Sequence, residues 1–176
     1  SDFDVPHRVS ALAVLPLPLR WGGSLTGLYT LRSDRPFTPM VAAGLDANGD
    51  GSPFNDVAFV PASGGAIESL AAEWACLARA MGGFAERNGC RGDPIHTLDA
   101  RLSLGLPRMG GVSGALVVDG LNLFDTDMGV RDDNLLLLRS GSVSRTEDGV
   151  EIPYRVNPGF GSWIFRGDTG RMLRVG

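Results

Sequence analysis

Apolar and polar residues alternate along several stretches of the chain. The stretch TLDARLSLGL, residues 97–106, has leucine or alanine at every second position and Thr, Asp, Arg, Ser or Gly between them. This period of two predicts a β-strand with one buried face. The stretch GSLTGLYTLR, residues 23–32, places Leu25, Tyr29 and Leu31 on one face in the same manner. It is predicted to be a second half-buried strand.

Further strands are predicted on both sides of these two. After the turn PRMGG, the run VSGALVVDGLNLF, residues 112–124, supplies an antiparallel partner for residues 97–106 and completes a hairpin. The first segment, HRVSALAVLPLPL at residues 7–19, is apolar on both faces, and its prolines suit an edge strand. The remaining candidates are NLLLLRSGSV (134–143), GVEIPYRV (149–156) and RMLRVG (171–176).

One segment has the spacing of a helix. Between residues 67 and 81 apolar side chains recur at i, i+3 and i+4, ahead of Gly82 and Gly83, where a helix would end. We therefore expect one mainly β domain over residues 1–176, an antiparallel sheet of about six or seven strands in a partial or collapsed barrel or sandwich. Its short amphipathic helix, 67–81, would lie in a long loop insertion over residues 43–96.

Composition and charge narrow the classes of function. The 25 glycines and 11 prolines favour turns and short strands over long helices. A net charge of −4 with no basic cluster argues against nucleic acid as a partner. No apolar run reaches the roughly 20 residues of a membrane-spanning helix. No leader precedes Ser1, so we expect that an export signal was removed or that the sequence belongs to a longer chain.

Two cysteines, Cys76 and Cys90, leave several interpretations open. A disulfide between them would close a short loop and stabilise the fold by about 3 kcal/mol on the loop-entropy model. Two buried free thiols in a cytosolic protein are the alternative. A zinc site is disfavoured because no His or Cys stands at zinc-finger spacing.

The segment LDANGDGSPFND, residues 45–56, has the spacing of a calcium loop. Asp46, Asn48 and Asp50 occupy positions 1, 3 and 5, and Gly51 supplies the turn at position 6. Val57 replaces the usual bidentate Glu at position 12, although Asp56 could substitute for it. The alternative is a polar turn closed by side-chain to backbone hydrogen bonds. Calcium is the one cofactor that the sequence suggests.

Catalytic patterns are missing from the sequence. His7 and His96 are the two histidines, and neither stands at the spacing of a metal pair or of a nucleophile and its base. The chain also lacks a Walker-type phosphate loop and a dinucleotide fingerprint. We expect no enzymatic activity.

A series of motifs resembles a known family from one end of the chain to the other. They are SDFDVPHRVSALAVLPLP, GLYTLRSDRPFTP, DANGDGSPFNDVAFVP, ERNGCRGDP, TLDARLSLGL, DGLNLFDT, NPGFG and GDTGRMLRVG. In this order they resemble the C-terminal β-barrel region of TonB-dependent outer-membrane receptors of the Oar-like, carboxypeptidase-regulatory-domain type, here truncated. The resemblance implies the last strands and outer loops of a barrel.

The resemblance also implies a disulfide pairing and a cellular compartment for the protein. The two cysteines match a pair common in an outer loop of that family, which implies a Cys76–Cys90 disulfide and an oxidising compartment. Such receptor barrels have roughly 22 strands, so the predicted strands do not close one. The family's N-terminal plug and energy-coupling segment have no counterpart in this sequence.

Two functions are carried forward. The first is a non-catalytic structural subunit, a membrane-extrinsic, periplasm-facing scaffold derived from a receptor C-terminus that holds a larger membrane complex together. Its specific form is a brace in a photosynthetic reaction centre with its antenna, binding other protein subunits, with contact to the membrane surface allowed. The alternative is the C-terminal fragment of an outer-membrane receptor for nutrient uptake.

Two apolar runs are candidate partner-binding surfaces under the scaffold hypothesis. They are Leu135, Leu136, Leu137 and Leu138, and Trp163, Ile164 and Phe165. Either run could instead fill the core of the protein itself.

Overall fold

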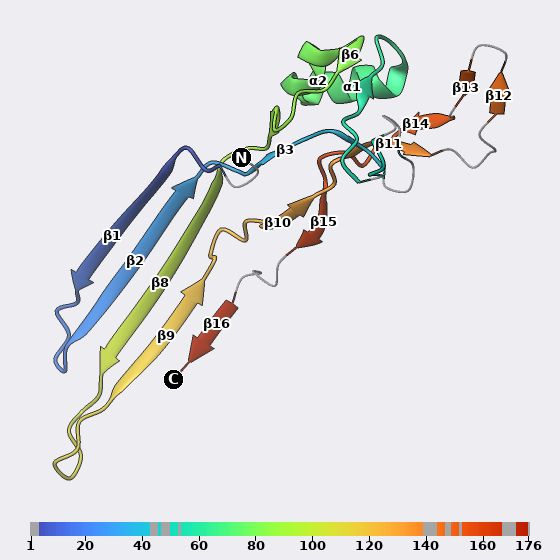
Figure 1. Cartoon of the computed structure of the whole chain (residues 1–176). Coiled ribbons are helices and arrows are strands. Elements are labelled where there is room, and N and C mark those ends of the chain that lie inside the picture. The colour runs from blue at the N-terminus through green and yellow to red at the C-terminus, as the bar shows by residue number, and fades with distance from the viewer. Residues whose placement is uncertain are drawn as a thin grey trace. The chain divides into compact units, whose positions relative to one another are not determined.

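The computed structural model describes residues 4–42, 46, 50–52, 54–138, 144–146, 149–151, 153–166 and 172–175. Within them the protein is mainly β, with antiparallel pairing in nearly every sheet and two short helices (Figure 1). The predicted fold class is confirmed. No helix in this described part combines the length and the apolar character needed to cross a membrane.

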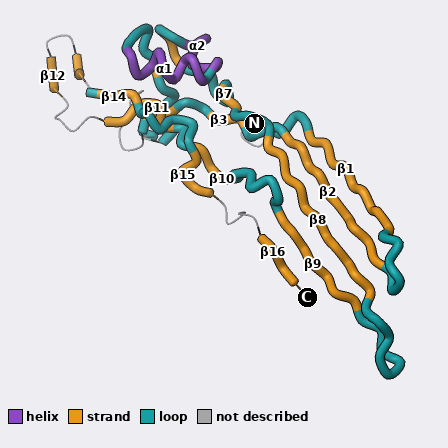
Figure 2. Tube along the Cα trace, turned by 180° about the vertical axis from the view of Figure 1, so that it is seen from behind, coloured by secondary structure: helices purple, strands orange, loops and turns teal. Residues whose placement is uncertain are grey.

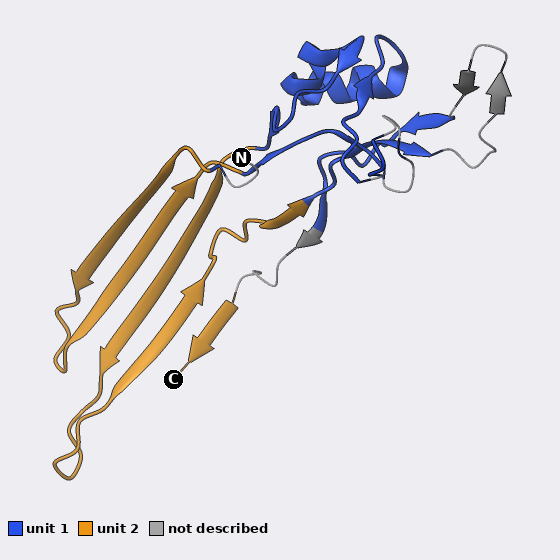
Figure 3. Cartoon of the chain, in the orientation of Figure 1, with its two compact units in different colours: residues 1–4, 35–92, 131–164 blue, residues 5–34, 93–130, 165–176 orange. Residues whose placement is uncertain are grey.

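The chain divides into two compact units, each assembled from separate stretches (Figure 3). Unit 1 falls within residues 1–4, 35–92 and 131–164, and unit 2 within residues 5–34, 93–130 and 165–176. The sequence led us to expect one domain with an insertion over 43–96. In the structure that insertion belongs to unit 1 as far as Gly92.

Unit 2 contains a five-stranded antiparallel sheet in the order β1-β2-β8-β9-β16. Figures 1 and 2 show its strands side by side. The bounds are β1 Arg8–Pro16, β2 Gly23–Arg32, β8 Ile95–Gly105, β9 Ala115–Leu121 and β16 Met172–Val175. The predicted hairpin, now β8 with β9, is confirmed, and so is the edge position of the first strand.

The connections of this sheet differ in length between its two ends. At one end, β1 joins β2 through residues 17–22 and β8 joins β9 through residues 106–114. At the other end, β2 reaches β8 through residues 33–94, and β9 reaches β16 through residues 122–171. Two of the three stretches of unit 1, residues 35–92 and 131–164, lie within these two long connections.

Unit 1 is built from short strands and two helices. β3 (Pro36–Phe37) pairs with β7 (Cys90–Arg91), and β5 (Phe59–Val60) pairs with β6 (Gly83–Phe84). β11 (Asn134–Leu138) lies between β14 (Tyr154–Val156) and β4 (Met40–Val41), to which it is parallel. β12 (Ser144–Thr146) and β13 (Gly149–Glu151) form a hairpin. A further two-stranded sheet, of β10 (Gly129–Arg131) and β15 (Trp163–Arg166), contains residues of both units.

The hydrophobic core that the structure describes lies in unit 1. Its largest fully buried side chains include Ile67, Leu77, Leu135 and Val60. Aromatic rings complete it, because Trp74 contacts both Phe37 and Phe160 at centroid distances of 5.4 and 5.8 Å. Unit 1 therefore has a hydrophobic core of its own.

The predicted helix over residues 67–81 is interrupted at its centre. α1 spans Gly65–Glu73 and α2 spans Ala75–Ala80, with Trp74 between them in an extended conformation (φ −112°, ψ 98°). Trp74 is only 9% exposed, and its ring takes part in the aromatic cluster of the core. Packing of this large ring accounts for a break that the continuous i, i+3, i+4 spacing does not predict.

Gly161 is expected to tolerate no side chain because it touches the Trp74 ring. Its backbone has a φ of +78°, and an added Cβ would collide with ring atoms of Trp74. Gly161→Ala should lower the stability of unit 1 by about 1–3 kcal/mol, measured by urea unfolding. Gly65→Ala is the matched control, since a Cβ there meets open space. Equal stability of the two variants would contradict the described packing of Trp74.

Candidate functional site

One face of the unit 2 sheet is apolar along its whole length, and we call it the apolar face. Residues that are register partners on neighbouring antiparallel strands share a face. One such row is Ala13, Gly27, Ala100 and Gly120, and the next is Leu15, Leu25, Leu102 and Val118. The remaining members are Val9, Ala11, Gly23, Tyr29, Leu31, His96, Leu98, Leu104, Leu116, Leu173 and Val175.

The opposite face, here called the polar face, carries charged and hydroxyl side chains among apolar ones. A central row contains Thr26, Arg101, Asp119 and Arg174. Arg101 Nε donates to Asp119 Oδ1 at 2.6 Å, and Arg101 Nη2 donates to Asp119 Oδ2 at 3.0 Å. This hydrogen bonding holds the pKa of Asp119 below its usual value and raises the pKa of Arg101. The two faces thus differ sharply in chemistry.

Among the described residues of unit 2, Leu123 lies against the apolar face at Gly120 and Leu19 lies against it at Gly23, and most of the face is left uncovered. Of the buried hydrophobic residues that the structure describes, Ile95 alone belongs to unit 2. Val9 and Leu15 are 55% and 57% exposed, and Leu173 is 72% exposed. Contiguous apolar surfaces of this kind are typical of proteins that contact a membrane or another protein.

Aromatic residues stand at both ends of the apolar face. Near the long connections, Tyr29 lies 6.4 Å from Phe124 between ring centroids, and its hydroxyl is 3.1 Å from Nδ1 of His96. At the other end, Trp21 lies in the turn between β1 and β2 and is 54% exposed. Amphipathic rings of this type favour the boundary between an apolar medium and water.

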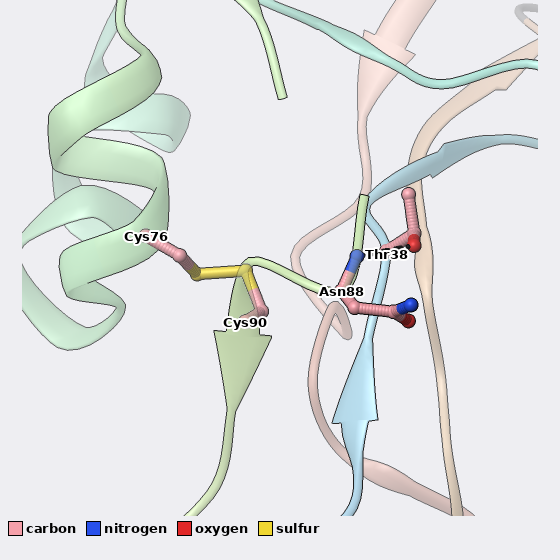
Figure 4. The surroundings of a disulfide bond; sticks show 4 residues. All are labelled: Thr38, Cys76, Asn88 and Cys90. Atoms are coloured by element: carbon pink, nitrogen blue, oxygen red, sulfur yellow. Dashed lines mark hydrogen bonds between the residues drawn. A yellow bond between two sulfur atoms is a disulfide. The ribbon is translucent and has the colours of Figure 1, made fainter. Parts of the chain in front are cut away.

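The Cys76–Cys90 disulfide is present in unit 1 (Figure 4). It links α2 to β7, with the two Cα atoms 5.2 Å apart, and Cys90 is fully buried. The adjacent loop is fixed because the Asn88 N–H donates to Thr38 Oγ1 at 2.8 Å. The disulfide therefore joins the helical part of unit 1 to the β3–β7 pair.

The two runs predicted to bind partners are only partly exposed. Leu135 and Leu136 lie in the core of unit 1, at 0% and 7% exposure, so burial leaves them no surface for a partner. Leu137 is half-buried and Leu138 is 48% exposed. The backbone of β11 explains the difference, because it passes from the core to the surface toward Leu138.

The second run behaves in a similar way. Trp163 is half-buried, and the Arg131 guanidinium carbon lies 4.0 Å from the centroid of the Trp163 ring. Ile164 is 60% exposed. The side chain of Phe165 lies outside the described residues. Leu138 and Ile164 are the members of the two runs whose exposure suits a partner contact.

The acidic loop is closed by its own hydrogen bonds. The Asp46 carboxylate accepts the N–H groups of Asp50 and Gly51, at 3.1 and 2.7 Å. The Asp50 carboxylate accepts the Ser52 N–H and the Asn55 side-chain amide, at 2.8 and 2.9 Å. These contacts match the polar-turn alternative.

Of the other two predicted calcium ligands, the structure describes Asp56 alone. Asp56 is 3% exposed, while Asp50 is exposed, and Asn48 lies outside the described residues. Burial, and then the charge of Asp56, raise the pKa of the Tyr154 hydroxyl. No group of three Asp, Glu, His or Cys residues able to hold a metal occurs in the described part of the chain. Calcium binding stays a prediction.

The turn and calcium interpretations differ in what Asp50→Ala does. Because Asp50 accepts two hydrogen bonds within the turn, we expect a loss of about 1–2 kcal/mol that is the same with calcium and with a chelator. Thermal unfolding of both proteins in both buffers measures this. A loss confined to the calcium buffer would establish the cation site instead.

Asp133 supplies a pH-dependent prediction. Burial raises its pKa above the usual value, and the neighbouring charge of Asp132 adds to the increase. A carboxyl whose pKa is raised in the folded state destabilises the fold once it is ionised. This loss of stability is absent at a pH below the ordinary Asp pKa, and it is complete at a pH above the raised pKa. Asp133→Asn should therefore raise the melting temperature at neutral pH but leave it unchanged in acid. Equal shifts at both pH values would contradict this assignment.

The two histidines take structural positions. His96 lies on β8 beside Tyr29, and the His7 carbonyl accepts the Ser33 N–H at 2.9 Å. That the protein is not an enzyme stays a prediction.

Sequence reasoning located the strands of the sheet but did not assign the residues of the apolar face as a site. The signal was present, because each long strand alternates with the same period. What was lacking was the register, which aligns these residues across β1, β2, β8, β9 and β16.

Comparison with protein-family models, curated proteins and solved structures finds no match.

Proposed function

We propose that the unit 2 sheet is part of the wall of a membrane-embedded β-barrel of the outer-membrane receptor class. The observation that carries the proposal is the uncovered apolar face, which lies opposite a face with charged and hydroxyl groups. Strands of membrane barrels alternate in this way, with apolar side chains toward lipid and polar side chains toward the lumen.

Strand length supports this proposal. β1, β2 and β8 have 9, 10 and 11 residues. A tilted strand needs about 9–11 residues to cross the hydrocarbon core of a bilayer. The aromatic residues near both ends of these strands match the girdles that flank the apolar band of such barrels.

The short and long connections between the strands of the unit 2 sheet also support the barrel proposal. Barrels of the outer membrane have short turns on the periplasmic side and longer loops on the outer side. Here residues 17–22 and 106–114 would be the short turns, and residues 33–94 and 122–171 the outer loops. The disulfide-linked part of unit 1 would then belong to the outer loops, in an oxidising compartment.

Further strands are required to complete such a wall. The five paired strands end at β1 and β16, and a receptor barrel of this class has roughly 22 strands. An open edge in a membrane would leave backbone groups without hydrogen bonds. The proposal therefore includes additional strands beyond both edges, from the same polypeptide.

A second candidate is the periplasmic scaffold subunit. It is favoured by unit 1, which holds a core and a disulfide of its own and so suits a stable protein-binding module. In this alternative the apolar face lies against another protein of a membrane complex, of which a photosynthetic reaction centre with its antenna is the specific form. The protein would then bind subunits and no pigment.

The mass of the native particle distinguishes the two candidates. The protein is extracted from the membranes of its source cells in mild detergent and analysed by native and denaturing mass spectrometry. The barrel proposal predicts one polypeptide of roughly 80 kDa or more that contains this sequence, because about 22 strands are needed. An 18.6 kDa chain bound to several different subunits would overturn the barrel proposal in favour of the scaffold.

A further inference from the structure

The polar face of the unit 2 sheet contains a hollow of about 490 Å³ at the end near the long connections. Residues of β1, β2, β8, β9 and β16 line it, together with Asn122 and Met128. All of them belong to unit 2. Its volume falls within the range of small-molecule sites.

Two arginines lie directly opposite each other at one end of this hollow. Arg8 of β1 and Arg32 of β2 are register partners on the same face, and both line the hollow. Like charges in this position repel each other and destabilise a sheet. Neither guanidinium has an ion pair or a side-chain hydrogen bond with another described residue, in contrast to Arg101 on the same face. An anion between them would remove the repulsion.

The next row of the hollow adds hydroxyl groups. Thr30 and Thr97 are register partners, one row from the arginine pair, and both line the hollow. Threonine hydroxyls can donate hydrogen bonds to a carboxylate oxygen. Guanidinium groups bind carboxylates with two parallel hydrogen bonds, so this end is suited to a carboxylate.

The remaining walls are largely apolar. Leu28, Ile95, Leu121, Met128 and Met172 line the hollow around the polar groups. The two methionines provide polarizable thioethers, which pack well against aromatic rings. This lining suits an apolar, ring-containing body attached to the charged head.

Asp99 limits where in the hollow the negative charge of a ligand can lie. It also lines the hollow, and its carboxylate accepts the Asn122 N–H at 2.8 Å. Asp99 is four residues along β8 from Ile95, the partner of Arg32, a distance of roughly 13 Å along a strand. The carboxylate of a ligand therefore belongs at the arginine end, with its apolar body toward Asp99.

We infer that this hollow binds a small organic anion, a carboxylate with an apolar aromatic body, held by Arg8 and Arg32. The inference rests on unit 2 alone and does not require the membrane proposal. In a barrel wall the ligand would face the lumen, and in a scaffold it would face water.

The test is calorimetric titration of the purified full-length chain with naphthalenecarboxylate. Naphthalenemethanol tests the ring without the charge, and acetate tests the charge without the ring. We expect binding of naphthalenecarboxylate at least tenfold tighter than either control, and weaker binding as salt is increased. Equal binding of the carboxylate and the alcohol would overturn the inference.

Variants assign the binding to the arginine pair. Arg8→Gln and Arg32→Gln should each weaken binding about tenfold or more, because each removes charge-assisted hydrogen bonds. Arg174→Gln is the matched control, since it makes the same change of charge on the same face outside the hollow. Asp99→Asn should strengthen binding by removing the nearest negative charge.

The melting temperatures of the variants show whether a loss of binding is due to unfolding. Removing one of two repelling charges should leave the melting temperature unchanged or raise it. Unaltered affinity in folded Arg8→Gln and Arg32→Gln would overturn the inference, as would an equal loss in Arg174→Gln. If a variant unfolds, the salt dependence and the two ligand controls on the unmodified chain decide the question.

Discussion

Val118→Arg is expected to destabilise the protein in a bilayer by about 2–4 kcal/mol, because it places a charge on the lipid side of the proposed wall. Val118 lies on the apolar face, with Leu102 and Val175 as its register partners. Reversible unfolding in urea, with the protein reconstituted in lipid vesicles, measures the loss through tryptophan fluorescence.

Val117→Arg is the control for this prediction. Val117 has the same side chain and a similar half-buried environment, but it is the partner of Ser103 on the polar face. Its replacement should cost well under half as much, since an arginine there faces water. Equal losses in the two variants would mean that the two faces do not have different surroundings.

Reduction of the Cys76–Cys90 disulfide is expected to have an effect of similar size. Cys90→Ser should lower the stability of unit 1 by about 2–5 kcal/mol and its melting temperature by several degrees. Two causes act together: the loop constraint is lost, and a hydroxyl replaces sulfur at a fully buried position. Differential scanning calorimetry in non-reducing buffer measures the change.

The unmodified chain treated with a reductant is the control for Cys90→Ser. It should lose most, but not all, of the same stability, because its buried thiol is less polar than serine. Intact-mass analysis after alkylation tests the bond itself. Alkylation of both cysteines without prior reduction would remove the disulfide and the argument for an oxidising compartment.

Local sequence was sufficient to predict the strands of unit 2. The strict alternation over residues 97–106 specifies which side chains share a face, and the turn PRMGG specifies a hairpin. Both are short-range properties, so the strand pair β8–β9 follows from them. The prolines of the first segment likewise predicted an edge, where β1 lies.

Packing between residues distant in the chain could not be predicted from the sequence. The apolar spacing of residues 67–81 continues through Trp74, and the break there depends on Phe37 and Phe160, which are distant in the chain. The opposition of Arg8 and Arg32 depends on the β1–β2 register. The apolar run with Leu135 and Leu136 was compatible with a partner surface and with the core, because its composition is the same in both cases.

The central claim is that lipid covers the apolar face of the sheet. Its most direct test attaches a fluorophore to Leu102→Cys or to Ser103→Cys, neighbours on β8 that face opposite sides, in the membrane-bound protein. The barrel proposal predicts that nitroxide-labelled lipids quench the label at position 102 while aqueous iodide quenches the label at position 103. A label at position 102 that lipid nitroxides do not quench would contradict the proposal and place another protein, or water, against this face.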